Sequence, residues 1–311
     1  MPQYSDFPQG EFEPELFDML LNGPLTYRVS RRAARLCPCD DGRSGGPAYD
    51  CPVCQGRGYI WSTVPTVEYE DTLTHYGTGL NPEWRFSFKI ADERLSRARV
   101  TEILEVRDQY GGTYSDVSVG KESAIIWGSR RPQPGTLYTV RYRAPEQMRL
   151  HAQGIRTQRS WAARGEVKEG DMECSIPERL EDLITPNPAF QAKEHDRFVF
   201  LDLERPVNQR MTRGSRETLL YPTFWEIKAA RAIVGGSEVT YEPGVDFVIN
   251  NNAVQWLTSG PPYGSPYVLD YIACPEYYVF AELPQMRHVD GLRLPRRVGL
   301  RLFDLYPGRG G

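Results

Sequence analysis

Residues 126–145 read IWGSRRPQPGTLYTVRYRAP, and residues 255–274 read QWLTSGPPYGSPYVLDYIAC. The two stretches align without gaps at a constant offset of 129 residues. The coinciding residues are Trp127 and Trp256, Gly135 and Gly264, Tyr138 and Tyr267, and Tyr142 and Tyr271. In each copy a strand that ends in Trp enters a loop rich in Pro and Gly. The strand that follows alternates Tyr, an aliphatic residue and Tyr, as expected of a half-buried antiparallel strand. The pattern predicts a β-hairpin that is used twice.

The repeat extends upstream in a weaker form and predicts two related domains. Val100–Val106 resembles Phe224–Ala230, with Glu102 aligned to Glu226, and about five extra residues separate these landmarks from the hairpin in the second copy. The chain also contains 25 Pro, 28 Gly and 18 Tyr residues, a composition typical of short strands joined by many turns. We therefore expect two β-domains of roughly 85 residues each, with a sandwich or barrel architecture.

A cluster of cysteines precedes the first domain. Four of the six cysteines lie within eighteen residues, in the pairs Cys37-Pro-Cys39 and Cys51-Pro-Val-Cys54, which are separated by an eleven-residue loop. Two closely spaced pairs across such a loop allow four thiolates to converge on one ion, and zinc suits sulfur ligands. The spacing predicts a zinc knuckle with Cys37, Cys39, Cys51 and Cys54 as ligands.

The composition of this cluster favours a structural zinc over a catalytic one. Four cysteines close the coordination shell, whereas a catalytic zinc keeps one position open for water. None of the four histidines of the chain, at positions 75, 151, 195 and 288, lies near either pair. A disulfide or reduced thiols are the alternative interpretation of the same spacing. The two remaining cysteines, Cys174 and Cys274, are predicted to be small buried hydrophobic residues.

The second cysteine pair resembles a single CxxCxGxG unit of the DnaJ-type zinc domain, because Gly56 and Gly58 follow Cys54 at the spacing of that motif. Both glycines leave the backbone free to approach the sulfurs. The first pair departs from that family, since one residue instead of two separates Cys37 from Cys39. The resemblance therefore covers the second pair alone.

Charge and motifs exclude several classes of function. The net charge is −4 and the isoelectric point is near 5.7, so the chain lacks the positive excess expected of a general nucleic-acid binder. No apolar run approaches membrane-spanning length and the N-terminus lacks a secretory signal, so we expect folding in a reducing cytoplasm. GxSxG, P-loop and HExxH motifs and paired Cys and His residues are missing from the sequence. We therefore expect no enzymatic activity and no catalytic residues.

These patterns divide the chain into five predicted segments. They are an N-terminal arm with the zinc knuckle (1–65), β-domain 1 (66–146), a linker or arm (147–196), β-domain 2 (197–283) and a C-terminal arm (284–311). The predicted fold is mainly β, with two related small antiparallel β-domains, an N-terminal four-cysteine zinc knuckle and extended arms. Outside the domains, Pro14–Leu21 and Ile176–Ile184 are predicted to be short helices, and Val298–Phe303 to add a strand to a sheet edge.

The segments outside the two domains carry unbalanced charge. The first twenty residues contain five acidic residues and no Lys or Arg, whereas six arginines lie between Pro284 and the end of the chain. Oppositely charged arms suit docking between subunits. The candidate interaction residues are Arg293, Arg296 and Arg297, together with Trp161 in the 147–196 segment. A plain surface linker with solvated, frayed ends is the alternative.

The cysteine motif near the N-terminus, the duplicated hairpins and the closing stretch Leu294–Arg301 together resemble virion proteins of tailed bacteriophages, of the neck (head-to-tail connector) or baseplate type. The resemblance implies a structural subunit that assembles with itself in a ring and contacts other virion proteins of the portal, connector and tail. It also implies a location in the virion after assembly in the cytoplasm of the bacterial host. It implies neither a membrane nor a nucleic acid as a main partner.

Two other functions compete with a neck or connector role. Trp127, Trp256, Tyr263 and Tyr267 could stack on sugars in a baseplate or receptor-binding module. Arginines that precede and follow the cysteines could instead contact nucleic acid, although the acidic balance of the chain opposes this. They are Arg31, Arg32, Arg35 and Arg57.

Overall fold

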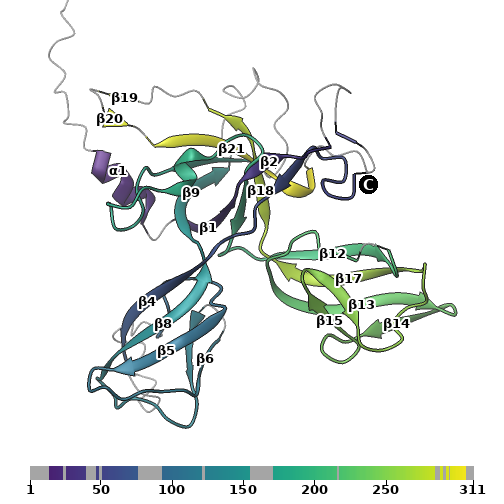
Figure 1. The fold of residues 1–311 in the computed structure, drawn as a ribbon, viewed down its shortest axis with the longest axis horizontal. Coiled ribbons are helices and arrows are strands. Elements are labelled where there is room, and N and C mark those ends of the chain that lie inside the picture. The colour runs from purple at the N-terminus through teal and green to yellow at the C-terminus, as the bar shows by residue number, and fades with distance from the viewer. Residues whose placement is uncertain are drawn as a thin grey trace, which may run out of the picture.

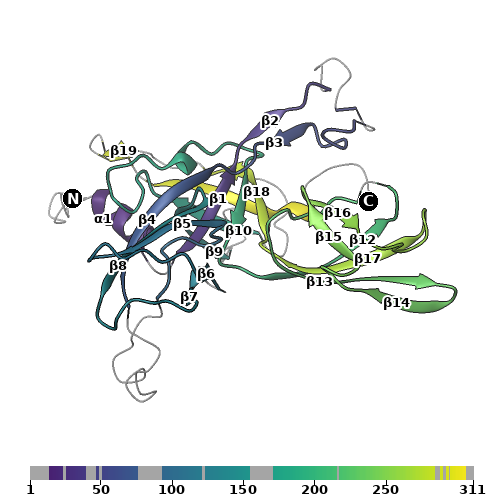
Figure 2. The same ribbon diagram turned by 60° about the horizontal axis from the view of Figure 1, so that its bottom comes forward.

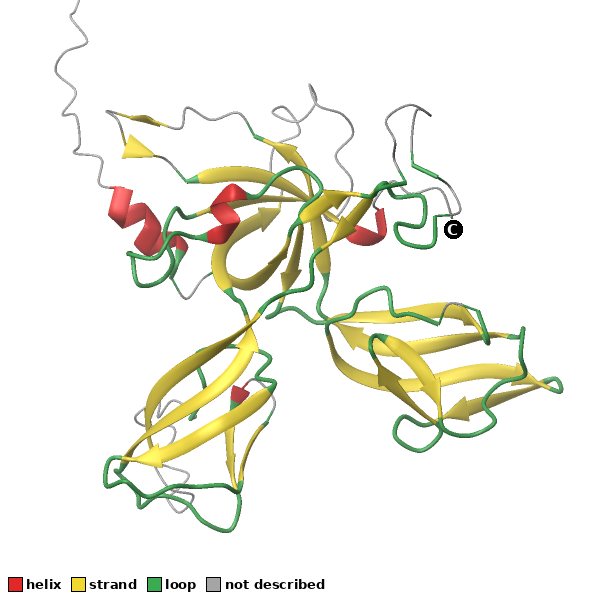
Figure 3. Ribbon diagram, viewed as in Figure 1, coloured by secondary structure: helices red, strands yellow, loops and turns green. Residues whose placement is uncertain are grey.

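Three β-structured units make up the described part of the protein: a central barrel and two smaller domains that project from it (Figure 1). The computed structural model describes residues 14–23, 26–39, 47–48, 51–75, 93–120, 123–154, 171–215, 217–283, 288–289, 292–293 and 295–305. Strands predominate and helices are few and short (Figure 3). The prediction of a mainly β protein with antiparallel sheets and an N-terminal cysteine cluster is confirmed.

Six antiparallel strands form the central barrel. They are β1 (Tyr27–Arg32), β9 (Met148–Gly154), β10 (Met172–Ile176), β11 (Arg197–Phe200), β18 (Glu276–Glu282) and β21 (Arg296–Leu302). They pair in the order β1-β11-β18-β21-β10-β9, and β9 pairs with β1 to close the barrel. Strands that are distant in sequence thus become neighbours in space.

The barrel is closed around aliphatic and aromatic side chains contributed by every strand. Phe198 and Phe200 of β11, Leu150 of β9 and Leu300 of β21 are all fully buried in one cluster. Cys174 of β10 is buried in the same cluster, as predicted for a small hydrophobic residue. Burial of this apolar surface is the main source of stability for the barrel.

The barrel corrects the predicted division of the chain. The segments expected to be a linker (147–196) and a C-terminal arm (284–311) contribute β9, β10 and β21 to it, and the N-terminal segment (1–65) contributes β1. The weak alternation of residues 147–196 predicts a linker. Its strands β9 and β10 are short and pair with each other, and their other neighbours, β1 and β21, lie far away in the sequence.

Two local predictions have opposite outcomes. The helix predicted at Pro14–Leu21 is present as α1 (Pro14–Leu21), and the Asp18 carboxylate accepts a hydrogen bond of 3.0 Å from the backbone N–H of Glu178. The helix predicted at Ile176–Ile184 is wrong, because Ile176 ends β10 and the following residues form turns.

Val298–Phe303, expected at a sheet edge, lies mostly in β21 with neighbours on both sides.

The remaining short elements connect the barrel strands. A 3₁₀ helix (Pro188–Gln191) lies between β10 and β11, the hairpin of β19 (His288–Val289) and β20 (Leu292–Arg293) precedes β21, and a second 3₁₀ helix (Phe303–Leu305) follows it. Asn187 caps the first of these helices through its side chain, which accepts a hydrogen bond from the N–H of Ala189.

The two smaller domains are insertions between consecutive barrel strands. Domain 1 lies between β1 and β9 and contains β4 (Thr66–Thr74), β5 (Glu102–Asp108), β6 (Val117–Val119), β7 (Ile125–Trp127) and β8 (Leu137–Pro145). Domain 2 lies between β11 and β18 and contains β12 (Arg205–Thr212), β13 (Phe224–Val234), β14 (Ser237–Tyr241), β15 (Phe247–Asn250), β16 (Ala253–Trp256) and β17 (Pro266–Ala273). The sheet order is β4-β8-β5 in domain 1 and β12-β17-β13-β14 in domain 2, each with a second two-stranded sheet, β6-β7 or β15-β16.

A carboxylate at the same place in both domains shows that they share one core. In domain 1, Glu93 accepts hydrogen bonds from Trp127 Nε1 (3.0 Å) and the Tyr138 hydroxyl (2.6 Å). In domain 2, Glu217 accepts them from Trp256 Nε1 (2.8 Å) and the Tyr267 hydroxyl (2.7 Å).

Each carboxylate also faces a basic residue at the end of the first strand. His75 Nδ1 lies 2.9 Å from Glu93, and Arg213 lies 3.4 Å from Glu217. The repeated tryptophans donate to these carboxylates and pack against the buried residues, so they are parts of the domain cores.

Backbone irregularities repeat as well. The pairing of β5 with β8 shifts register between Ile103 and Glu105, and the pairing of β13 with β17 shifts between Ile227 and Ala229. A bulge at an equivalent position in both sheets is a specific feature of a fold. The predicted relationship between the two domains is therefore visible in hydrogen bonds and strand pairing as well as in the sequence.

Removal of the repeated tryptophan from domain 2 tests its place in the core. Trp256 contacts the rings of Tyr241, Phe247 and Tyr267. We expect Trp256→Ala to lower the free energy of unfolding by about 3–5 kcal/mol, as for other large aromatic residues in cores. Tyr263→Ala is the control, because that side chain is 79% exposed and its loss should cost within about 0.5 kcal/mol. Urea unfolding followed by circular dichroism measures both, and equal stability of the two variants would contradict a core role.

Candidate metal centre

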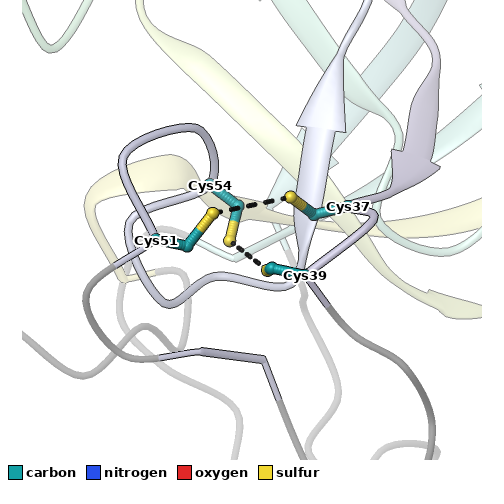
Figure 4. Close-up of side chains that lie close together, drawn as sticks. All are labelled: Cys37, Cys39, Cys51 and Cys54. Atoms are coloured by element: carbon teal, nitrogen blue, oxygen red, sulfur yellow. Dashed lines mark hydrogen bonds between the residues drawn. The ribbon is translucent and has the colours of Figure 1, made fainter.

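The four clustered cysteines converge on one point beside the barrel. Their sulfur atoms all lie within 4.8 Å of one another (Figure 4). Cys37 Sγ lies 3.8 Å from Cys51 Sγ, and Cys39 Sγ lies 3.3 Å from Cys54 Sγ. All four are free thiols, and Cys37, Cys51 and Cys54 are buried. The structure thus brings together the whole predicted ligand set.

A short hairpin and a tight turn position these thiols. The strands β2 (Ala34–Leu36) and β3 (Tyr59–Trp61) pair with each other, and the N–H of Cys37 donates to the carbonyl of Gly58 over 2.8 Å. Gly56 and Gly58 have φ values of 74° and 78°, a region that favours glycine. These two glycines therefore allow the chain to turn back behind Cys54. We call residues 34–61 the knuckle.

Backbone dipoles and burial set the electrostatics of the thiols. Hydrogen bonds from the backbone N–H groups of Cys54 and Val53 lower the pKa of Cys51 to about 6. Burial raises the pKa of Cys39 to about 12, and hydrogen bonds with the neighbouring thiols act in the same direction. Four sulfurs cannot all ionise at this spacing without a cation among them, because like charges so close together repel one another.

The donor set fits a tetrahedral metal ion. Zinc–thiolate bonds of about 2.3 Å in a tetrahedron place sulfurs roughly 3.8 Å apart, which matches the Cys37–Cys51 separation. Among the described residues the cluster contains cysteines only, without His, Asp or Glu. Among the described hydrophobic residues, Ile60 alone packs against the cysteines, so this part of the knuckle has almost no hydrophobic core of its own. A metal ion here can replace a core that the segment is too small to build.

Aromatic residues of β3 attach the knuckle to the barrel. Tyr59 stacks on His195 with ring centroids 4.1 Å apart, and the edge of Trp61 meets Phe303 at 5.2 Å. Trp61 Nε1 donates to the carbonyl of His195 over 2.8 Å. Burial lowers the pKa of His195, so its imidazole is favoured in the neutral form that stacks on Tyr59.

A buried ion pair lies beneath this contact. Glu276 is fully buried and pairs with Arg197, whose side chain is 5% exposed, and with Arg32 at 3.4 Å. The Arg197 guanidinium also lies 3.4 Å from the centre of the Phe303 ring, a cation–π contact. Burial lowers the pKa of Arg197 to about 10, although Glu276 opposes the shift. The carboxylate of Glu276 is therefore the counter-charge for two arginines at the junction of knuckle and barrel.

Two of the predicted interaction residues, Arg296 and Arg297, have side chains that the structure describes, and both form ion pairs within the barrel. Arg296 is buried, and its guanidinium pairs with Glu282 at 2.8 Å and donates to the carbonyl of Phe190 at 2.9 Å. Arg297 pairs with Glu173 of the neighbouring strand β10. Arg293 lies in β20 with its side chain outside the described part of the structure, and Trp161 lies outside the described residues. The buried Arg296 therefore joins β21 to β18 and to the 3₁₀ helix at Pro188–Gln191, instead of lying on the exposed arm that the sequence predicted.

Sequence patterns missed the carboxylates at the centre of the two domains. Glu102 and Glu226 are the glutamates that recur in the aligned repeat. Both are exposed, and Glu102 pairs with Arg143 at 2.9 Å on the sheet surface. Glu93 and Glu217 have the same offset, 217 − 93 = 124, which equals 226 − 102. This shared offset is the sequence pattern that identifies Glu93 and Glu217 as equivalent residues of the two domains.

Removal of the buried negative charge tests the knuckle contact. We expect Glu276→Gln to lower the free energy of unfolding by about 3–5 kcal/mol, because Arg197 and Arg32 lose their counter-charge. Glu68→Gln is the matched control, since Glu68 is a half-exposed partner of Arg143 and its loss should cost less than about 1 kcal/mol. Chemical denaturation measures both, and a Glu276→Gln variant as stable as Glu68→Gln would refute the role of Glu276.

A scan against protein-family models matches none of them, and a search of the curated proteins also finds no match. Within the described residues, no helix has the length and apolar character needed to span a membrane. The function is therefore inferred from the residues of the chain and their geometry.

Proposed function

We propose that the protein is a structural subunit of a tailed-phage virion, in the neck or head-to-tail connector, and that its knuckle holds one structural zinc ion. The convergence of four thiols on one point carries the zinc proposal. Cys37, Cys39, Cys51 and Cys54 would complete the coordination shell, and the ion would supply rigidity rather than a reactive site. The assembly role follows the sequence resemblance.

The use of buried charge supports a structural role. Asp196 is buried and binds Arg31 at 2.7 Å, and Asp171 is buried and binds Arg301 at 2.7 Å. Each pair joins chain segments that are more than a hundred residues apart. Both carboxylates form ion pairs that hold the barrel together, which suits a protein with a structural role.

The aromatic residues give little support to a sugar-binding role. Trp127 and Trp256 donate their indole N–H groups to Glu93 and Glu217, and Tyr267 is 1% exposed. Tyr263 alone of the four candidate residues is exposed, at 79%. A single tyrosine lacks the stacking platform expected of a carbohydrate site.

Metal analysis with cysteine variants tests the zinc proposal. Elemental analysis of the reduced, purified chain should find about one zinc per chain. Cys51→Ser should lose the zinc and the near-ultraviolet circular dichroism of Tyr59 and Trp61, because the knuckle loses its closed shell. Cys174→Ala, which alters a thiol in the barrel core, should keep the zinc. Absence of zinc from the wild-type chain, with all four knuckle cysteines freely alkylated, would refute the proposal.

Quantitative mass spectrometry of purified phage particles tests the assembly role. We expect the chain in intact particles at a fixed copy number relative to the portal protein, as a symmetric ring requires. Its absence from the particles, or a purified chain that stays monomeric and binds glycans with micromolar affinity, would contradict the proposal.

A further inference from the structure

The sheet of domain 2 ends in a strand whose outer edge has no strand partner among the described residues. β14 is the last strand in the order β12-β17-β13-β14 and pairs on one side with β13. Figure 2 shows it at the outer border of domain 2, away from the barrel and from domain 1. An unpaired edge presents a row of backbone donors and acceptors to another strand.

The hairpin geometry identifies the backbone groups that point outward. Gly235 and Gly236 both have positive φ values, 59° and 86°, as in a two-residue type I′ turn. Val234 and Ser237 flank this turn and form a hydrogen-bonded pair, and such pairs alternate along an antiparallel ladder. Val239 therefore directs its backbone groups at Ala232. The N–H and C=O groups of Glu238 and Thr240 point away from β13.

Among the described residues, domain 1 has no strand equivalent to β14. The equivalent hairpin of domain 1 is shorter, because Asp108 closes it by accepting hydrogen bonds from the N–H groups of Tyr110 and Gly112 and from the Tyr114 hydroxyl. The longer hairpin also carries Ile233, which is 65% exposed. β14 contains no Pro, Lys or bulge, the usual devices that protect an edge strand from pairing.

We propose that β14 pairs with β14 of a second copy of the chain, in antiparallel orientation and centred on Val239. In this register Glu238 of one copy lies opposite Thr240 of the other, so both outward-facing residues of each strand are hydrogen-bonded. A shift by two residues in one direction would place Glu238 opposite Glu238 of the second copy, and a shift in the other direction would place it opposite Glu242. Like-charge repulsion disfavours both registers. The charge pattern of the strand thus selects one two-fold register.

Side chains on both faces of the sheet suit this register. On the outer face, Arg231 pairs with Thr240 across β13 and β14, so Glu238 of one copy lies in line with Thr240 and Arg231 of the other. Arg231 is 45% exposed and already lies 3.5 Å from Glu238 of its own chain. On the inner face, the half-buried Val239 meets its counterpart on the two-fold axis.

The contact is short. Its formation requires neither a zinc ion in the knuckle nor a role in a virion. Five residues from each copy bury less than the roughly 1,200 Å² typical of stable complexes. Association in solution is therefore weak and depends on concentration. Multiple copies held near one another would reinforce it.

Charge variants at the edge test the pairing. Sedimentation velocity over about a hundredfold range of concentration should show a monomer–dimer equilibrium. Thr240→Glu, which faces Glu238 of the second copy, should weaken the dimer by about tenfold or more, and the double variant Glu238→Lys with Thr240→Glu should restore it. Thr240→Pro should also abolish the dimer because it removes an outward N–H, while circular dichroism confirms that the fold is kept. Absence of self-association, or a dimer that tolerates both single variants, would overturn the proposal.

Disulfide trapping tests the register separately. Val239 lies opposite itself in a non-hydrogen-bonded pair, where Cα atoms are roughly 4.5 Å apart, within the range that a disulfide spans. Val239→Cys should therefore cross-link two chains under mild oxidation, and peptide mapping should find the bond between the two engineered cysteines. Ser237→Cys is the control, since it faces Tyr241 of the second copy and should not cross-link. Equal cross-linking of the two variants, or none at Val239→Cys, would contradict this register.

Discussion

Closure of the central barrel is the constraint on which the rest of the structure depends. β21 lies between β18 and β10, and β9 returns to β1, so strands from both ends of the described chain must meet before the barrel exists. The buried pair of Arg301 with Asp171 fixes the last strand beside the start of β10. Because the knuckle with domain 1 and domain 2 are each inserted between barrel strands, both ends of every insertion are held by the barrel.

The two inserted domains show which interactions a duplicated fold retains. A carboxylate that accepts from Trp and Tyr, a basic partner and a bulge are common to both, whereas the exposed sheet faces differ. Burial opposes ionisation of Glu217, but the hydrogen bonds from Trp256 and Tyr267 outweigh it and lower its pKa. A buried acceptor with several donors is costly to change one residue at a time, because each change leaves a polar group without a partner. The surfaces are free of this constraint, and the extended β13–β14 hairpin of domain 2 is one result.

Local patterns in the sequence predicted local structure well and long-range pairing poorly. The helix at Pro14–Leu21 and the cysteine cluster depend on residues close together in the chain. The hairpins predicted at residues 126–145 and 255–274 are wrong in their pairing: the strands that end in Trp127 and Trp256 pair with the strands before them, β6 and β15, whereas β8 and β17 belong to the larger sheets. The barrel strands offer only short alternating runs, such as Val298, Leu300 and Leu302, whose partners lie far away in sequence. Each barrel strand pairs on both edges with other strands, most of them distant in sequence, so its neighbours cannot be predicted from the pattern of one segment. For the same reason the sequence predicts an exposed arm around Arg296, although this residue is buried at the start of β21, one of the barrel strands.

The knuckle combines a cluster of four cysteines that could hold a metal ion with a contact that the barrel supplies. Its thiols are held by two strands and a glycine-containing turn, and Tyr59 and Trp61 pack on His195 and Phe303. In the zinc proposal, the four thiolates form a complete and purely structural shell around the ion. X-ray absorption spectroscopy at the zinc edge of the purified chain measures this shell. Four sulfur ligands at about 2.3 Å are predicted. A coordination shell that contains nitrogen or oxygen donors would contradict the proposal.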